Sequence, residues 1–200
     1  MHTRTIILSV LFVGGVVLFH HSGLLAQTKA ADVKKKAQIE RGAYLVTLAG
    51  CDDCHSPKVM TPKGPETDMT KRLSGQPADA KVPEIPAGVL GPEAWVALTN
   101  GHFTAWAGPW GISFARNLTP DVATGLGSWT EEIFIKAIRT GKDMGEGRDI
   151  LPPMPWPNFA QMTDADLKAV FAFLHSLPPI SNAVPDPISP TGERIPTMKK

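Results

Sequence analysis

Cys51-Asp52-Asp53-Cys54-His55 places two thiols one helical turn apart, with an imidazole directly after the second. At this spacing both cysteines can form thioethers to the vinyl groups of one haem, and the adjacent histidine is then held beneath the iron as its proximal ligand. We therefore predict a single covalently attached haem c, bound through Cys51, Cys54 and His55.

The same cysteines allow three other interpretations: a redox Cys-x-x-Cys pair, half of a zinc site, or a disulfide. Zinc would need two further soft or imidazole ligands at short spacing, and the chain has only 2 cysteines. A thioredoxin-like pair follows a strand within a βαβ unit, whereas here a helical pattern precedes the motif and Pro57 soon follows it. Covalent haem is therefore favoured, and a haem-free thiol protein is kept as an alternative.

The first 26 residues have the layout of a secretory signal peptide. Arg4 is followed by an apolar stretch from Ile6 to Phe19, which is shorter than the roughly 20 residues of a membrane-spanning helix. We expect cleavage near Ala26. Leu24 fits the small-residue rule for cleavage poorly, so an uncleaved N-terminal anchor is the alternative. In both cases the following domain is exported, and we expect a periplasmic location.

Composition bounds the rest of the chain. Roughly 174 residues remain after the leader, enough for one domain with a core. We divide them into a linker over 27–34, a haem-binding domain over 35–178 and a proline-rich tail over 179–200. The chain carries 20 basic and 19 acidic side chains, and this near-neutral balance argues against a nucleic-acid partner.

Helical periodicity is found in two segments, one directly before the haem motif and one at the end of the domain. Residues 33–50 form an imperfect apolar pattern that ends at Gly50, and Gly42 inside it predicts a close crossing with another helix. The expected partner begins at Thr163, with Asp166 three residues later, and stops before the prolines that follow residue 177. Its buried stripe comprises Leu167, Val170, Phe171 and Leu174.

Two further helices are expected between these. One is short and covers 92–99, and the other runs from a capping box at Ser128 and Glu131 to Gly141. No stretch alternates convincingly as a strand, and 19 prolines and 18 glycines predict long loops, such as 56–91. The fold class expected is therefore all-α, with four to five short helices around one haem, which replaces part of the hydrophobic core.

The sixth position of the iron separates an electron carrier from a catalyst. Met154 is the preferred ligand because the prolines around it, in Leu151-Pro152-Pro153-Met154-Pro155-Trp156-Pro157, fix an extended loop. Met162, directly before Thr163, is expected to pack as a hydrophobic staple, and His175 is expected to be solvated. The other possible ligands after the leader are Met60, Met69, Met144, Met198 and His102, and an open site also stays possible.

Several short motifs resemble the class I cytochrome c domain, and in particular the single-haem modules in the cytochrome subunits of alcohol and aldehyde dehydrogenases. They are Cys51-Asp52-Asp53-Cys54-His55, Arg116-Asn117-Leu118-Thr119-Pro120-Asp121, Thr124-Gly125-Leu126-Gly127, Trp129-Thr130-Glu131-Glu132 and Met154-Pro155-Trp156-Pro157. The likeness covers roughly residues 35–178, one module and not a whole subunit. It implies that His55 and Met154 are the axial pair.

Two protein ligands leave the iron no vacant position, so the expected chemistry is outer-sphere exchange of single electrons and not catalysis. We expect a dehydrogenase as donor and an oxidase or another cytochrome as acceptor. A haem enzyme or gas sensor with a labile sixth ligand is the alternative. Candidate walls of the haem pocket are Trp95, Phe103, Trp106, Trp110, Phe114 and Trp129. Candidate partners of the haem propionates are Arg116, Asn117, Trp110 and Trp129.

Overall fold

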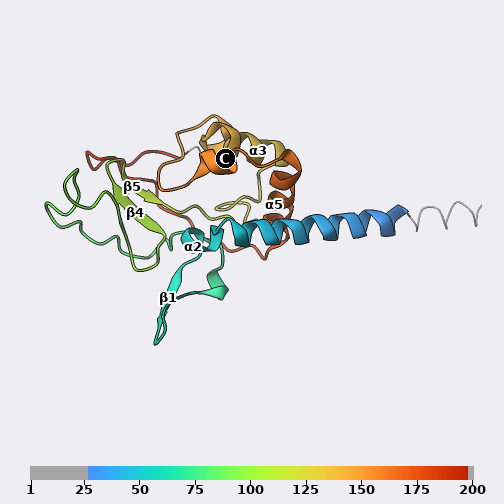
Figure 1. Cartoon of the computed structure of the whole chain (residues 1–200), viewed down its shortest axis with the longest axis horizontal. Helices are drawn as coiled ribbons and strands as arrows, with labels where there is room; N and C mark the ends of the chain where they lie inside the picture. Colours follow the sequence, from blue (N-terminus) through green and yellow to red (C-terminus); the bar gives the residue numbers. More distant parts are fainter. Residues whose placement is uncertain (1–26, 198–200) are drawn as a thin grey trace, which may run out of the picture. The chain divides into compact units, whose positions relative to one another are not determined.

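The computed structural model describes residues 27–197 (Figure 1). The predicted signal segment, 1–26, therefore lies outside the described residues. Contacts divide the chain into a unit that ends at Gln38 and a second unit that begins at Ile39. The described part of the first unit, which includes the segment expected as a linker, is helical. All residues discussed below belong to the second unit.

The haem motif lies on a short helix of its own, α2, which spans Cys51–His55. Helical residues 39–48 precede it. The second half of the unit holds α3 (Glu131–Thr140), α4 (Trp156–Phe159) and α5 (Asp164–Ser176). Two 3-10 helices, η1 (Met69–Lys71) and η2 (Asp143–Gly145), interrupt the loops. The helical framework expected around the motif is thus present.

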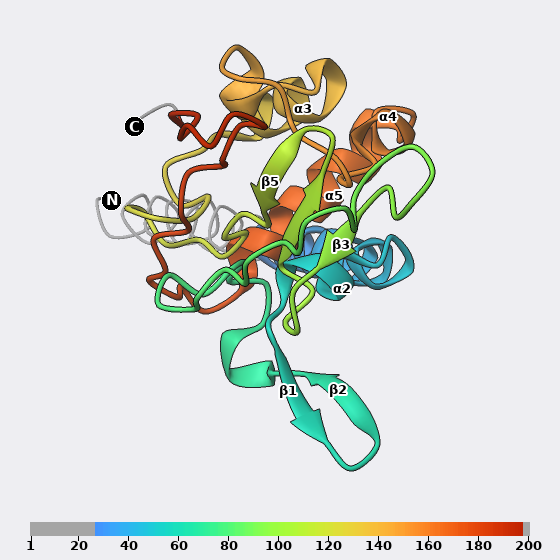
Figure 2. The same ribbon diagram turned by 90° about the vertical axis from the view of Figure 1, so that its left-hand side faces the viewer.

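The all-α expectation was wrong in one respect, because the described residues also contain short strands. An antiparallel hairpin joins β1 (Lys58–Thr61) to β2 (Gly64–Thr67), and it extends away from the helices in Figure 2. A second antiparallel sheet has the order β3 (Leu98–Thr99), β4 (Ala105–Gly108), β5 (Gly111–Phe114). None of these strands exceeds four residues, which is too short for an alternating pattern to stand out in the sequence.

The helix expected over 92–99 is absent. Residues 91–95 form turns, a parallel bridge joins Leu90 to Trp95, and the chain then enters β3. Trp95 is 68% exposed, so this segment has no buried apolar stripe to hold a helix against the core.

The residues that cap α3 and α5 are of the expected types, but the N-cap of α3 is a different residue from the one predicted. Thr163 caps α5, because its side chain accepts a hydrogen bond from the Asp166 amide at 3.1 Å. Gly141 ends α3 in the left-handed region, as expected. The N-cap of α3 is Thr130 and not Ser128: the Thr130 hydroxyl accepts from the Ile133 amide at 3.3 Å. The N-cap of α3 therefore lies two residues after the predicted one.

The close helix crossing predicted at Gly42 is confirmed. A Cβ atom built on Gly42 would lie 1.9 Å from the Ala169 carbonyl oxygen of α5 and 2.7 Å from the Phe173 Cβ. Beside this contact, Leu45 and Val46 are buried in a core that includes Leu167, Val170 and Leu174 of α5. Tyr44 and Leu48, which the imperfect periodicity also included, are exposed. The crossing sets the position of α2, which starts three residues after the helical stretch ends.

The described part of the tail packs against the second sheet. Ile188 forms an antiparallel bridge with Ile112 of β5, and the Ile180 carbonyl accepts a hydrogen bond from the Asn117 side chain at 2.8 Å. These contacts hold the segment before α3 in place from the outside.

Replacing Gly42 with alanine should lower the free energy of unfolding by about 2 kcal/mol or more, because the new methyl group meets backbone atoms that can move only if the helices separate. Denaturant unfolding of the haem-loaded protein would measure the loss. Gly101→Ala is the matched control, since nothing lies within 4 Å of a Cβ built there. Equal stabilities of the two variants would contradict the close crossing.

Candidate cofactor site

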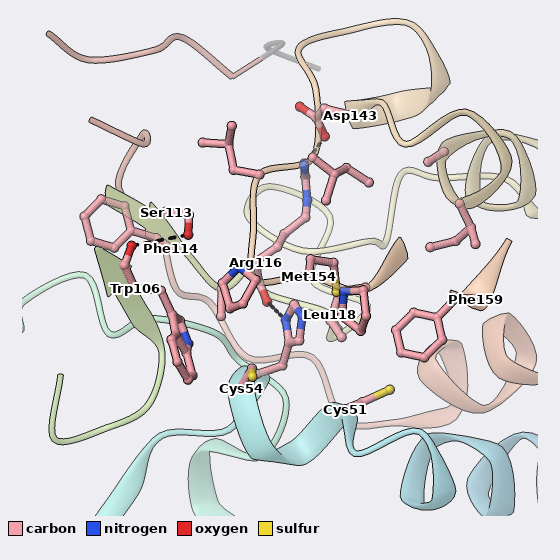
Figure 3. A pocket seen from close by; sticks show the side chains of 18 of the residues that line it. Cys51, Cys54, Trp106, Ser113, Phe114, Arg116, Leu118, Asp143, Met154 and Phe159 are labelled. Atoms are coloured by element: carbon pink, nitrogen blue, oxygen red, sulfur yellow. Dashed lines mark hydrogen bonds and ion pairs between the residues drawn. The ribbon is translucent and has the colours of Figure 1, made fainter. Parts of the chain in front are cut away.

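A cavity of about 420 Å³ opens in the second unit between α2, the β4–β5 hairpin, α3 and the loop that leads to α4. Its walls are largely apolar. Figure 3 shows Cys51 and Cys54 presented by α2, with Met154 and Phe159 on the segments facing them. A volume of this size falls in the range of ligand and cofactor pockets, roughly 300–1,000 Å³.

The cavity brings together all four residues expected to bind the cofactor. Cys51, Cys54 and His55 come from α2, and Met154 comes from the loop before α4. The Ser113 hydroxyl of β5 donates a hydrogen bond to the Pro152 carbonyl at 2.5 Å and so ties this loop to the sheet. Residues almost a hundred positions apart in the chain therefore line one space.

His55 is buried, and its ring orientation is determined by one hydrogen bond. Nδ1 lies 2.7 Å from the Arg116 carbonyl oxygen, which can only accept, so Nδ1 carries the proton and donates. Nε2 is then left with its lone pair available for a metal. Burial lowers the pKa of His55, which favours the neutral imidazole that a ligand must be.

Neither cysteine has the environment of a reactive thiol. Both are free and half-buried. Burial, together with the negative charge of Asp52, raises the pKa of Cys51 to about 11, and burial also raises the pKa of Cys54. A redox-active thiol pair needs the opposite shift. Within residues 27–197 there is also no cluster of three or more His, Cys, Asp or Glu side chains that would suit a metal ion.

Among the candidate sixth ligands that the structure describes, only Met154 lines the cavity. Met60 and Met69 are exposed, and Met144 and Met162 pack against the hydrophobic core. His102 Nδ1 lies 2.9 Å from the Lys58 carbonyl oxygen, outside the cavity. Met198 lies outside the described residues.

His175 was expected to be solvated, and the structure corrects this. Its Nε2 lies 3.1 Å from the Leu126 carbonyl oxygen, and its ring packs on Phe171 at 4.0 Å between centroids. It packs behind the cavity wall and not in it.

One end of the cavity is polar and charged. The guanidinium of Arg116 forms an ion pair with Asp143 and stacks 4.9 Å above the centre of the Trp129 ring. Arg148 lines the same end. Four buried polar atoms here have no hydrogen-bond partner in the protein: Arg116 Nε, Trp129 Nε1, Asp143 Oδ2 and Arg148 Nε. Three of the four carry N–H groups, so this end is suited to bind a carboxylate.

The residues expected to meet the propionates divide into two that line the cavity and two that do not. Arg116 and Trp129 line the polar end, whereas Asn117 and Trp110 do not line the cavity. The Asn117 side chain is fully buried, and it bonds to Thr124, Thr119 and the tail. Of the expected aromatic wall, Trp106, Phe114 and Trp129 contribute, and Phe134 and Phe159 join them; Trp95, Phe103 and Trp110 lie elsewhere.

Sequence reasoning missed Asp143 and Arg148. Both lie in the loop after α3, which folds back on itself: the Asp143 amide donates to the Arg148 carbonyl at 2.8 Å, and the Ile150 amide donates to the Gly141 carbonyl at 2.7 Å. No periodicity marks such a loop. A charged residue in a glycine-rich loop is usually solvated, and only the fold shows that Asp143 is buried and that Arg148 is partly buried.

No helix within the described range 27–197 combines the length and hydropathy needed to cross a bilayer.

Comparison with known proteins finds a matching family model and curated relatives that are named as cytochromes or cytochrome subunits. The family model "Cytochrome c" matches residues 39–178. The gluconate 2-dehydrogenase cytochrome c subunit of Pantoea cypripedii is 30% identical over 158 residues, which is 78% of this chain and 27% of that protein. The cytochrome c subunit of the quinone alcohol dehydrogenase of Gluconobacter oxydans (strain 621H) is 32% identical over 166 residues, 80% of this chain and 26% of that subunit. A fructose dehydrogenase cytochrome subunit of Gluconobacter japonicus is 32% identical over 139 residues, 70% of this chain and 21% of that subunit. The chain thus spans about a quarter of the length of these relatives.

Asp143→Asn should lower the free energy of unfolding by about 3 kcal/mol, because it removes a buried carboxylate that balances two partly buried arginines while keeping the shape of the side chain. The measurement is denaturant unfolding of the haem-loaded protein. Asp149→Asn is the control: it weakens the exposed pair with Lys142, 2.6 Å apart, and should cost less than about 1 kcal/mol. A loss as small at Asp143 as at Asp149 would show that the charge at the polar end is not buried in solution.

Proposed function

Since the chain belongs to the cytochrome c family, we propose that it is a single-haem c-type cytochrome that transfers electrons one at a time. Cys51 and Cys54 attach the haem through thioethers, and His55 and Met154 are its axial ligands. The observation that carries this proposal is that these four side chains line one cavity. The family membership supports the covalently bound haem c and a role in electron transfer rather than catalysis.

The cavity suits this cofactor chemically. Apolar walls from β4, β5 and α3 match the porphyrin ring, and the unpaired donors of Arg116, Trp129 and Arg148 match the negative charge of haem propionates. When bound, the haem iron supplies a couple between a ferric and a ferrous state, which differ by one electron.

The protein residues have separate parts in this function. The Arg116 carbonyl keeps the His55 imidazole in one tautomer, with Nε2 free to bind the metal. The proline-bounded loop, tied to Ser113, presents the Met154 thioether. A thioether ligand and a water-poor pocket both favour the reduced state, so they raise the reduction potential. With His55 and Met154 both bound to the iron, no position on it would be left for a substrate.

We propose a dehydrogenase as the electron donor and an oxidase or another cytochrome as the acceptor. The support is that similar proteins are named as cytochrome subunits of gluconate, alcohol and fructose dehydrogenases. This chain corresponds in length to one part of those subunits, so it is proposed as one module and not as an equivalent of the whole. The leader-like segment over 1–26 supports export, which suggests a periplasmic site of action.

The mature protein should be red, and its intact mass should exceed that of the polypeptide by one haem that survives denaturation. Each cysteine forms one of the two thioether bonds to the haem, so Cys51→Ala or Cys54→Ala should leave at most one covalent bond to it. Mass spectrometry of denatured samples makes the measurement. A colourless, fully matured protein with no added mass would support the haem-free thiol protein instead.

Met154→Ala should abolish the long-wavelength sulfur-to-iron absorption band of the oxidised protein and lower its reduction potential, because it removes the thioether ligand. The reduced variant should then bind carbon monoxide rapidly at neutral pH, whereas the native protein should not. Optical redox titration measures the reduction potential, and rapid mixing with carbon monoxide measures the rate at which the reduced protein binds it.

Met162→Leu is the matched control, since Met162 packs against the core and does not line the cavity. This variant should keep the band. Rapid carbon monoxide binding by the native protein would favour a haem enzyme or gas sensor with a labile sixth ligand.

A further inference from the structure

Lys58 is a buried lysine beside the haem motif that the mechanism above does not use. It is the first residue of β1, and only 8% of its surface is exposed. Its ammonium group donates to the carbonyl oxygens of Asp52 at 2.6 Å and Ser56 at 2.9 Å, and to the Thr67 hydroxyl at 3.3 Å. Three donated hydrogen bonds use all three N–H groups of the charged form, whereas a neutral amine has only two.

The two carbonyls that Lys58 binds lie on either side of His55 in sequence. Asp52 lies in α2 and Ser56 is the residue that caps its C-terminal end; the Asp52 carbonyl also accepts from the Ser56 amide at 3.3 Å. The neighbouring His55 carbonyl accepts from the Gly75 amide at 2.8 Å, and the Pro57 carbonyl accepts from the Asp68 amide at 2.8 Å. Lys58 thus completes a set of hydrogen bonds that holds the end of the haem-binding helix.

Two further charges join this cluster. The Asp52 carboxylate pairs with the Arg72 guanidinium through two nitrogens, at 2.7 Å for Nη2 and 3.0 Å for Nε, and accepts from the Ser56 hydroxyl at 2.6 Å. Despite its burial, these partners lower the pKa of Asp52. The cluster of Asp52, Lys58 and Arg72 therefore holds one negative and two positive groups. The exposed carboxylate of Asp53 adds a negative charge that water screens.

A buried positive charge costs desolvation energy and needs a reason to be retained. Burial lowers the pKa of Lys58, while Asp53 and Asp52 act in the opposite sense. A charge this close to the proximal histidine also acts on the iron: it disfavours the ferric state, which carries one more positive charge than the ferrous state.

We propose that Lys58 is a positioning residue of the redox centre, which holds the end of the haem-binding helix and whose charge raises the reduction potential of the haem. This inference rests on the proposed function, since it requires a haem ligated by His55. It also explains why the hairpin begins where it does: β1 starts at the residue that anchors it to α2, while the rest of the β1–β2 hairpin extends outward (Figure 2).

The test compares two variants of the haem-loaded protein with opposite charge changes. Lys58→Met should lower the equilibrium constant for reduction by about three- to tenfold, which is roughly 28 to 59 mV for a one-electron couple. Asp52→Asn should raise it, because it removes a negative charge from the same cluster. Both changes weaken the same hydrogen-bond network, so a purely structural role would shift the potential in the same direction in both variants. Optical redox titration measures each midpoint.

Lys63→Met is the control, because Lys63 is an exposed lysine of the same hairpin whose charge is screened by water. Its potential should match that of the native protein. Unchanged potentials in Lys58→Met and Asp52→Asn, or shifts of one sign, would overturn the inference.

If Lys58→Met does not mature with haem, Lys58→Gln takes its place, because the neutral amide removes the charge and can still donate two hydrogen bonds: a lower potential supports the proposal, and an equal or higher one refutes it. Failure of the proposed function would look different, because the native protein would then either carry no haem or bind carbon monoxide rapidly.

Discussion

The hydrogen bond from the His55 imidazole to the Arg116 carbonyl oxygen is the contact on which the rest of the site depends. It joins two segments 61 residues apart and sets the tautomer of the proposed iron ligand. The same arginine extends its guanidinium to the polar end of the cavity, where it meets Asp143 and Trp129. Arg116 therefore connects the proximal side of the haem site to the groups that suit the propionates, and a displacement of its backbone would disturb both.

The framework around this contact is small, and a cavity of about 420 Å³ lies within it. Gly42 lets the helix before the motif approach α5 closely, which places α2 against the core of Leu45, Leu167 and Leu174. Long loops connect the few regular elements, and side-chain and backbone hydrogen bonds hold them, as at Ser113 and Asn117. Because the cavity walls are apolar and its polar end has unpaired donors, a haem bound there would complete both the hydrophobic core and the hydrogen bonding.

Much of the helical framework could be predicted from local patterns. The cap at Thr163, the burial of three α5 residues and the close approach at Gly42 follow from residue chemistry that acts over one or two turns. The three are Leu167, Val170 and Leu174, whereas Phe171, expected in the same stripe, is only partly buried. The strands and the segment over 92–99 could not, because four-residue strands have too little alternation, and a proline near the start of a segment also suits a turn. The N-cap of α3 is Thr130 and not Ser128, because both residues have a hydroxyl group that can accept a hydrogen bond from the first turn of a helix, and the sequence alone does not distinguish them.

The sequence by itself determined the haem motif, the preference for Met154 and the resemblance to the cytochrome c family, since cysteine spacing and proline placement carry chemical information without a fold. Only the tertiary structure decided which charged residues are buried. Asp143 and Arg148 enter the cavity because a loop folds back on itself, and Lys58 is buried because a hairpin begins beside α2. Burial depends on contacts between distant segments, and the free energy of a charge depends on burial more than on its neighbours in the chain.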